Sequence, residues 1–247
     1  MLLNTVRENP IRSYCKEGIQ MNNIIHPTAI VEGDVELGTD NHIEAYCVLK
    51  GPLKIGSGNR ISPFVTIGTP GQDTRNRFYD SSKALICIGD NNIIREYTAI
   101  QKPCYEAVTQ IGNSVFIMQG VHVPHDAHIS DDAVITPGCV FGGLVRILRG
   151  ANVALGVKVS QKVVIGHYSI AGMGSSVLKN IKPFSRHVPG KPISVNTYAI
   201  KKFDLGDCQS EIEAYVLENR IPTQDSRIFP IISEYLELAA KHGIGEY

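Results

Sequence analysis

The sequence has no excess charge of either sign, since 24 Lys and Arg residues balance 24 Asp and Glu residues. A surface that binds polyanions generally needs clustered positive charge, so this balance argues against nucleic acid as a partner. Residues 1–20 also lack an apolar run long enough for a signal peptide or a membrane span. What is present is a chain of 247 residues, long enough to bury a large core in one or two domains.

Cysteine pairs that would suggest a redox or zinc motif are also missing, because no two cysteines are spaced as CxxC. The six cysteines are Cys15, Cys47, Cys87, Cys104, Cys139 and Cys208. In a chain of this length, such a pattern is typical of reduced, buried thiols that serve as small apolar side chains. We therefore expect a cytoplasmic protein.

Apolar residues recur at every sixth position in the middle of the chain. The series comprises Ile111, Ile117, Val123, Ile129, Ile135, Phe141, Ile147, Val153, Val159, Ile165, Ala171 and Val177. Helices repeat near 3.6 residues and strands near 2, so neither accounts for this period. Six residues make a short strand and a corner, and three such units make one triangular coil. The period therefore predicts a parallel β-helix of hexapeptide repeats, an all-β fold.

The same ladder is present earlier in the chain and brings the total to 23 positions. Its earlier members are Ile25, Val31, Leu37, Ile43, Leu49, Ile55, Ile61, Ile67, Ile88, Ile94 and Ile100. Two steps, from Ile67 to Ile88 and from Ile100 to Ile111, are not multiples of six. We therefore expect loops that leave the coil near residues 68–87 and 101–110. Long loops within a regular repeat are commonly functional, and the alternative is a flexible surface insertion.

The repeats define the expected domain organisation. Residues 22–182 are predicted to form the β-helix, and residues 1–21 to precede it as an N-terminal arm. Prolines between residues 183 and 206 predict an extended segment. Apolar spacing near 3.6 then predicts two C-terminal helices within residues 183–247, which would cap the open end of the prism or pack on its side.

Two further expectations concern the surface of the prism. Glycines beside the rungs should supply positive φ at tight corners: Gly38, Gly56, Gly89, Gly112, Gly156 and Gly166. Apolar residues between the rungs are expected to face outward: Val115, Val121, Ala133, Val145 and Ala151. Three prisms packed about a threefold axis would bury such faces, so we expect a homotrimer.

The segment Met118–His128 holds three histidines, His122, His125 and His128, with Asp126 beside the second. One interpretation is a general base, in which the carboxylate orients the imidazole of His125. Another is a metal site, because HxxHxxH could supply three imidazoles. The third is a set of surface histidines at corners without chemistry. The residues alone leave these alternatives open.

Four segments of the chain resemble the UDP-N-acetylglucosamine acyltransferase family of lipid A biosynthesis. They are IHPTAIVEGDVELG from residue 25, IGTPGQDTR from residue 67, IGDNNIIREYTAI from residue 88 and VHVPHD from residue 121. The resemblance extends from His26 to about Phe203. It implies a left-handed β-helix, a homotrimer and acyl transfer from a thioester to a nucleotide sugar.

The resemblance also implies catalytic roles for three residues. His125 takes the position of the family's general base, and Asp126 that of its neighbour. Gly143 matches the glycine whose N–H faces the thioester oxygen. No covalent enzyme intermediate is expected, because no Ser or Cys stands beside a plausible base.

Substrate contacts follow from the same resemblance. Gln72, Asp73 and Arg75 match loop positions that meet the sugar, and His122 matches the first His of the family motif. Gln161 matches a position on the nucleobase side of the site. Lys201 and Lys202 fall where the family has basic residues near the diphosphate. Met173 falls where the family sets acyl-chain length, which predicts short to medium acyl groups.

The sequence departs from the family at three site positions: Leu144 and Ser160 stand in place of histidines, and Gly71 in place of an asparagine. The acceptor is therefore left open among nucleotide sugars, at a hydroxyl or an amine. The donor is expected to be acyl carrier protein or coenzyme A carrying an acyl thioester, with no permanently bound cofactor and no metal. Alternatives are an acetyl-CoA-dependent nucleotide amino-sugar N-acetyltransferase, a γ-carbonic-anhydrase-like zinc enzyme and a non-catalytic assembly protein.

Overall fold

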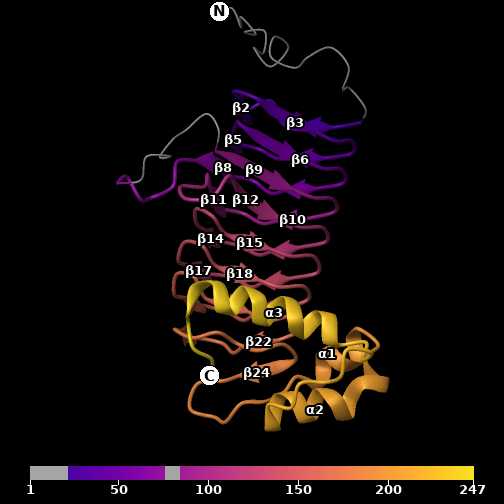
Figure 1. Cartoon of the computed structure of the whole chain (residues 1–247). Helices are drawn as coiled ribbons and strands as arrows, with labels where there is room; N and C mark the ends of the chain where they lie inside the picture. Colours follow the sequence, from indigo (N-terminus) through magenta and orange to yellow (C-terminus); the bar gives the residue numbers. More distant parts are fainter. Residues whose placement is uncertain (1–21, 76–83) are drawn as a thin grey trace, which may run out of the picture.

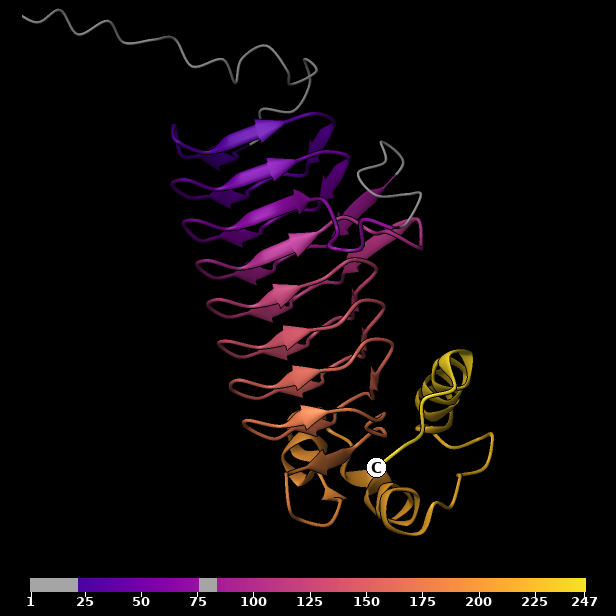
Figure 2. The ribbon, with the colours of Figure 1, turned by 90° about the vertical axis from the view of Figure 1, so that its left-hand side faces the viewer.

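The computed structural model describes residues 22–75 and 84–247. The expected N-terminal arm of residues 1–21, Cys15 and the middle of the first predicted loop lie outside the described residues. The chain winds into a tall triangular prism of stacked coils, with its helices gathered at the C-terminal end (Figures 1 and 2). Three sheets, here called A, B and C, form the three faces of the prism.

Sheet A contains ten strands, and all neighbours pair in parallel except the last two, β24 and β25. Its strands are β1 (Ile24–Ile25), β4 (His42–Ile43), β7 (Arg60–Ile61), β10 (Ile93–Ile94), β13 (Phe116–Ile117), β16 (Val134–Ile135), β19 (Asn152–Val153), β22 (Ile170–Ala171), β24 (Ser185–His187) and β25 (Ser194–Val195).

Sheet B contains eight parallel strands. They are β2 (Ile30–Glu32), β5 (Val48–Lys50), β8 (Thr66–Thr69), β11 (Ala99–Gln101), β14 (His122–Val123), β17 (Val140–Phe141), β20 (Lys158–Val159) and β23 (Ser176–Val177).

Sheet C contains seven parallel strands. They are β3 (Val35–Leu37), β6 (Leu53–Ile55), β9 (Leu85–Ile88), β12 (Val108–Ile111), β15 (His128–Ile129), β18 (Arg146–Ile147) and β21 (Val164–Ile165).

Each of the strands β1 to β23 contains one member of the six-residue ladder, as the period predicts. The ladder side chains point inward and form one continuous core. Most are fully buried, whereas Ile25, Val31 and Leu37 of the first coils are partly buried because they lie at the open end. The chain leaves the regular coil between β8 and β9 and between β11 and β12, the two places where the six-residue period slips. The hexapeptide period therefore specifies both the coils and the places where the chain leaves them.

The expected orientation of the intervening apolar residues was wrong. Val115, Val121, Ala133, Val145 and Ala151 are at most 1% exposed and belong to the core of their own prism. Each lies just before a strand, where the turn directs its side chain inward beside the rung. These residues therefore provide no support for contacts between subunits.

The expectation for the corner glycines was also wrong in five of six cases. Gly156 has a positive φ, but Gly38, Gly56, Gly89, Gly112 and Gly166 do not. A Cβ on Gly112, for example, would lie 2.7 Å from the backbone nitrogen of Asp131 in the next coil. These glycines are required by the close stacking of the coils. The left-handed corner positions are occupied by other glycines, such as Gly120 and Gly138, and by Asp, Asn and aromatic residues, such as Asp40, Tyr46 and Asn91.

The segment expected to be extended after residue 183 contains regular structure. It holds the hairpin of β24 and β25 and a short helix, α1 (Thr197–Lys202). The side chain of Asn196 caps this helix by accepting a hydrogen bond from the backbone N–H of Ala199. Proline content concealed these elements, because the capping signal for a six-residue helix is short.

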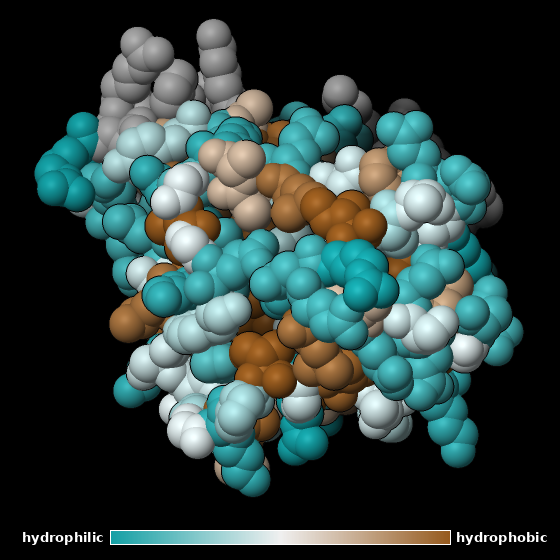
Figure 3. All heavy atoms as spheres, turned by 60° about the horizontal axis from the view of Figure 1, so that its bottom comes forward, coloured by the Kyte–Doolittle hydropathy of each residue, from teal (hydrophilic) through white to brown (hydrophobic). Residues whose placement is uncertain are grey.

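The two predicted C-terminal helices are present as α2 (Gln209–Glu218) and α3 (Phe229–His242), with a 3-10 turn, η2 (Gly206–Cys208), before them. Helix α3 packs on the side of the prism, where Tyr235 contacts a cluster that includes Leu148 and Val164 (Figure 1). Apolar and polar side chains are mixed on the surface around this end (Figure 3). Within residues 22–75 and 84–247, no helix combines the length and apolar character needed to cross a bilayer.

Candidate active site

The site residues with the strongest chemical signal gather at one edge of the prism, the corner where the chain passes from sheet B to sheet C. His125 lies at this BC corner between β14 and β15, and Gly143 lies there between β17 and β18. Both loops, after β8 and after β11, leave the coil at the same corner. The described parts of both loops stand next to His125, since Gly71 of the first loop and Tyr105 of the second lie near its side chain.

His125 and Asp126 form a hydrogen-bonded pair, with 2.7 Å between Nδ1 and Oδ2. The Asp126 side chain is fully buried, and its oxygens also accept hydrogen bonds from the backbone N–H groups of Cys104, Tyr105 and Glu106. Burial disfavours the charged form, but the hydrogen bonds from His125 and these N–H groups outweigh it and lower the pKa of Asp126. The carboxylate is therefore ionised, which assigns the proton to Nδ1 and leaves Nε2 as the basic nitrogen.

The imidazole of His125 lies directly on the backbone of Gly143. A Cβ on Gly143 would lie 2.6 Å from Nε2 and 2.9 Å from Nδ1. Within the described part of the chain, the N–H of Gly143 donates no hydrogen bond. A basic nitrogen thus lies close to a glycine whose N–H donates no hydrogen bond among the described residues. These two groups are the ones needed for proton removal and for stabilising an oxyanion.

The first loop reaches the same place. A Cβ on Gly71 would lie 2.9 Å from Cβ of His125, so this position has no room for a larger side chain. Asp73 accepts hydrogen bonds from the Arg75 side chain, at 3.1 Å, and from the hydroxyl of Tyr105. These two partners lower the pKa of Asp73 to about 2. The described part of this loop is therefore tied to the second loop beside His125.

The other two histidines of the motif lie on two different faces of the prism. His122 lies on sheet B, where burial lowers its pKa and its Nε2 has no hydrogen-bond partner among the described residues. His128 lies on sheet C, and its Nε2 is 3.2 Å from the carbonyl oxygen of Val108 and 3.3 Å from Glu106. The HxxHxxH spacing therefore spreads across a corner. Over residues 22–75 and 84–247, no three His, Cys, Asp or Glu side chains are placed to hold a metal ion.

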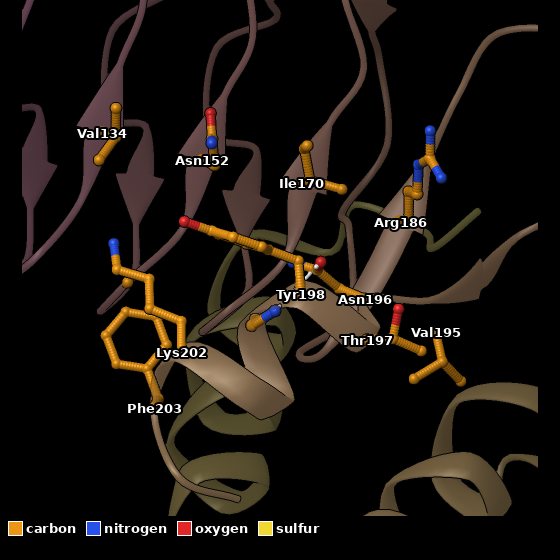
Figure 4. A pocket seen from close by; sticks show the side chains of 12 residues that line it. Val134, Asn152, Ile170, Arg186, Val195, Asn196, Thr197, Tyr198, Lys202 and Phe203 are labelled. Carbon is orange, nitrogen blue, oxygen red and sulfur yellow. Dashed lines mark hydrogen bonds between the residues drawn. The ribbon is translucent and has the colours of Figure 1, made fainter.

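The remaining residues suggested by the sequence do not join this cluster within one chain. Gln161 is exposed at the BC corner, two coils after His125. Met173 is 69% exposed at a different corner, between sheets A and B. Lys202 lines a pocket beside sheet A with Arg186 and Tyr198, and Lys201 precedes it in α1 (Figure 4).

Sequence reasoning missed the second loop as a part of the site. Tyr105 has its ring centroid 5.7 Å from that of His125, and the loop donates three N–H groups to Asp126. The register slip between Ile100 and Ile111 was a usable signal. The slip places an insertion at the BC corner one coil before His125. An insertion at that point lies next to His125.

The chain has the architecture of a hexapeptide-repeat transferase, with a His–Asp pair against the backbone of Gly143 at one corner of the prism. In agreement, the bacterial transferase hexapeptide family, defined by six repeats, matches residues 109–143. A relative from Syntrophobacter fumaroxidans, named acyl-[acyl-carrier-protein]–UDP-N-acetylglucosamine O-acyltransferase, is 34% identical over 204 residues, which cover 73% of this chain and 78% of the relative. The chain therefore belongs to the acyl-[acyl-carrier-protein]–UDP-N-acetylglucosamine O-acyltransferase family and is an acyltransferase.

A relative of the same name from Gloeothece citriformis is 34% identical over 68% of this chain, and the match spans about half, 53%, of the relative's length. Two solved structures support the fold. The UDP-N-acetylglucosamine acyltransferase of Francisella novicida matches with a TM-score of 0.72 and 24% identity, over 91% of each chain. That of Bacteroides fragilis matches with a TM-score of 0.68 and 24% identity, over 93% of this chain and 100% of the other. The fold is thus the expected left-handed parallel β-helix.

Proposed function

We propose that this enzyme transfers an acyl group from an acyl carrier protein thioester to a hydroxyl of a UDP-N-acetylglucosamine-like nucleotide sugar. The donor and acceptor are those named for the relatives from Syntrophobacter fumaroxidans and Gloeothece citriformis. The observation that carries the proposal is the position of the His125 ring, with Nδ1 bonded to Asp126 and Nε2 close to the backbone of Gly143. Together these groups supply a base and an oxyanion donor within one site.

The proposed reaction uses these groups in one sequence. Nε2 of His125 takes the proton from the acceptor hydroxyl as its oxygen bonds to the thioester carbonyl carbon. The N–H of Gly143 donates to the resulting oxyanion. Collapse of this intermediate breaks the carbon–sulfur bond, and the imidazolium returns the proton to the leaving thiolate. General base catalysis contributes about 10²–10⁴-fold and one oxyanion donor about 10²–10³-fold, so no permanent cofactor is needed.

Substrate contacts form a second part of the proposal. We assign the sugar to Gln72, Asp73 and Arg75 of the first loop and to His122, because the loop is tied to the second loop next to His125. Asp73 stays ionised well below neutral pH, since its pKa is about 2, and it can accept hydrogen bonds from sugar hydroxyls.

The diphosphate and nucleobase contacts are proposed to come from residues remote from His125 in one chain. Lys202 and Arg186 line the sheet A pocket and provide positive charge suited to a diphosphate, with Lys201 adjacent. Gln161 is proposed to contact the nucleobase. A site that combines the BC corner of one prism with sheet A of another would join these groups.

We therefore also propose a homotrimer, in which neighbouring prisms complete each other's sites. Apolar side chains on the outer faces support such packing: Ile24 and Ile93 on sheet A are 58% and 38% exposed, and Ile30 and Val140 on sheet B are 47% exposed. For the cellular location we propose the cytoplasm. The described cysteines, including Cys47, Cys104 and Cys139, are all unpaired, as expected in a reducing compartment.

A different acceptor is a second candidate, because Gly71 leaves no side chain where the family has an asparagine, and Leu144 and Ser160 stand in place of histidines. The test is to incubate the purified enzyme with acyl carrier protein loaded with acyl groups of increasing length and with coenzyme A thioesters. Each donor is combined with UDP-N-acetylglucosamine or with UDP-linked amino sugars, and products are identified by mass spectrometry.

We expect acylation of UDP-N-acetylglucosamine by acyl carrier protein thioesters, and loss of about 10²–10⁴-fold in rate for His125→Ala. His26→Ala, an exposed histidine of the first coil, is the matched control. Product formed with an amino sugar alone would overturn the assigned acceptor. Undiminished turnover by His125→Ala would overturn the assigned base.

A further inference from the structure

The buried carboxylate of Asp126 depends on the second loop for its hydrogen bonds. Its Oδ1 accepts from the N–H groups of Tyr105 at 3.0 Å and Glu106 at 2.7 Å. The N–H of Cys104 approaches both oxygens, at 3.2 and 3.1 Å. Oδ2 is 2.7 Å from Nδ1 of His125. An ionised carboxylate without water is costly unless its lone pairs are satisfied, so the loop is a condition for the His–Asp pair.

This loop is held to the prism by the side chain of Arg146, which arises from β18 on sheet C and is 3% exposed. Its Nη1 donates to the backbone carbonyl of Asp126 at 2.8 Å. Its Nη2 donates to both carboxylate oxygens of Glu106, at 2.7 and 2.8 Å. The guanidinium of Arg146 thus binds both Asp126, which accepts hydrogen bonds from the N–H groups of the loop, and Glu106, which belongs to the loop.

The pair of Arg146 and Glu106 is well suited to fix the loop. Charge-assisted hydrogen bonds of this length are about twice as strong as neutral ones. Breaking this pair is costly because it leaves the buried guanidinium of Arg146 without its partner. Glu106 is also 3.4 Å from Lys241 of α3 and 3.3 Å from Nε2 of His128. Side chains from the C-terminal helix and from sheet C therefore both lie against the carboxylate of Glu106.

We infer that Arg146 and Glu106 are positioning residues for acyl transfer, which hold the second loop so that its N–H groups fix Asp126 and, through it, the ring of His125. This inference rests on the proposed function of His125 as the base. Neither residue touches the reacting atoms. Their loss frees the loop, removes N–H donors from Asp126 and lets the imidazole leave its position over Gly143.

The test uses the full-length chain with the substitutions Arg146→Met, Arg146→Lys and Glu106→Gln. Arg149→Met is the matched control, since Arg149 pairs with Asp132 at 3.1 Å at the opposite corner of sheet C and makes no contact with the loop. Hydrogen exchange of residues 104–106, the nitrogen signals of the His125 ring, kcat and the acceptor KM are measured for each protein.

For Arg146→Met and Glu106→Gln we expect kcat to fall by roughly 10- to 100-fold, the range seen when partners of functional groups are removed, with less than about a twofold change in KM. Amide exchange at residues 104–106 should rise, and the protonated Nδ1 signal of His125 should weaken. Arg146→Lys should restore part of kcat, because it keeps the charge but cannot bridge both partners. The variant that combines Arg146→Met with Glu106→Gln should lose no more kcat than the worse of the two single variants, because the two residues form one link.

Faster exchange at the loop with an unchanged His125 signal and unchanged kcat would overturn the positioning role. An equal loss of kcat in Arg149→Met would show a general effect of destabilisation and would also overturn it. If the wild-type protein transfers no acyl group to any acceptor, the proposed function fails. Hydrogen exchange and the His125 signal still decide whether the pair fixes the His–Asp geometry.

Discussion

The ring of His125 rests on the Cα of Gly143, so closely that a methyl group there would lie 2.6 Å from Nε2. This contact couples the proposed base to the proposed oxyanion donor, because a displacement of one moves it away from the other. The contact also explains why position 143 is a glycine, since any side chain there would occupy the space of the imidazole.

Gly143→Ala should therefore displace His125 and lower kcat by at least about 10²-fold, the lower limit for removing a general base. The substitution requires no strained φ, so we expect the prism to remain folded. Steady-state kinetics and a thermal melt check this. Gly206→Ala is the control, because a Cβ at Gly206 would meet nothing within 4 Å. Normal turnover by Gly143→Ala would show that the imidazole works from another position.

Asp126→Asn should lower kcat without abolishing it. The carboxylate holds the proton on Nδ1 of His125 and orients the ring, and a neutral amide does both less firmly. The side-chain N–H₂ of Asn also opposes the N–H groups of Cys104, Tyr105 and Glu106. Steady-state kinetics test this, and an unchanged kcat would mean that Asp126 does not orient His125.

The stability of the fold should depend on pH through His167. This side chain is 4% exposed between the prism and α3, and burial, with a smaller effect of Arg149, lowers its pKa to about 4. Glu234 of α3 lies 3.3 Å from Nε2, but it is half-exposed and its charge is screened by water. Folded His167 is therefore neutral where histidine in the unfolded chain, with a pKa near 6.5, binds a proton.

Between pH 6.5 and 4 the unfolded state binds more protons than the folded state, so the free energy of unfolding falls as the pH falls. The loss adds up to on the order of 3 kcal/mol for a shift from 6.5 to about 4. Urea unfolding of the wild type and of His167→Gln at pH 7 and pH 4.5 measures it. The variant should show a smaller loss, and equal losses would rule out His167 as the source.

The sequence predicted the parts of the molecule that repeat and missed those that depend on contacts across the chain. The step of six from Ile111 to Val177 predicted every coil in that range, and the slips predicted both loops. The period gives no direction for the residues between rungs, so Ala133 was wrongly expected to face outward. The link between Glu106 and Arg146 spans 40 residues and follows from stacking, which no local pattern reveals.

In the candidate site too, the sequence predicted what a local motif contains and missed what depends on contacts between distant parts of the chain. His125 and Asp126 were found from their motif, and the structure joins them at 2.7 Å. Lys202 stayed separate, because sheet A and the BC corner are different faces of one prism. Only a second copy of the chain can bring them together, and periodicity within one chain carries no information about assembly.

Acyl-chain length is proposed to be set by Met173, which is 69% exposed at the corner between sheets A and B. This exposure excludes a role as a core side chain within one prism. Its neighbours Gly172 and Gly174 have no side chains, so an unbranched acyl chain could run along this corner until it meets Met173. An acyl chain that ends at Met173 leaves no room for the last methylenes of a longer chain.

Met173→Gly should therefore shift the preference toward longer acyl groups. Each buried methylene contributes about 0.8 kcal/mol, so access for two or three more improves selection of the longer donor by more than about tenfold. Stability should fall by no more than about 1 kcal/mol, since an exposed side chain is removed and glycine adds conformational freedom to the unfolded chain. Competition between thioesters of increasing length measures the shift. Leu155→Gly, at the same corner one coil earlier and 47% exposed, is the control. If Met173→Gly and the wild type choose the same length, the acyl chain does not reach this corner and its length is set elsewhere.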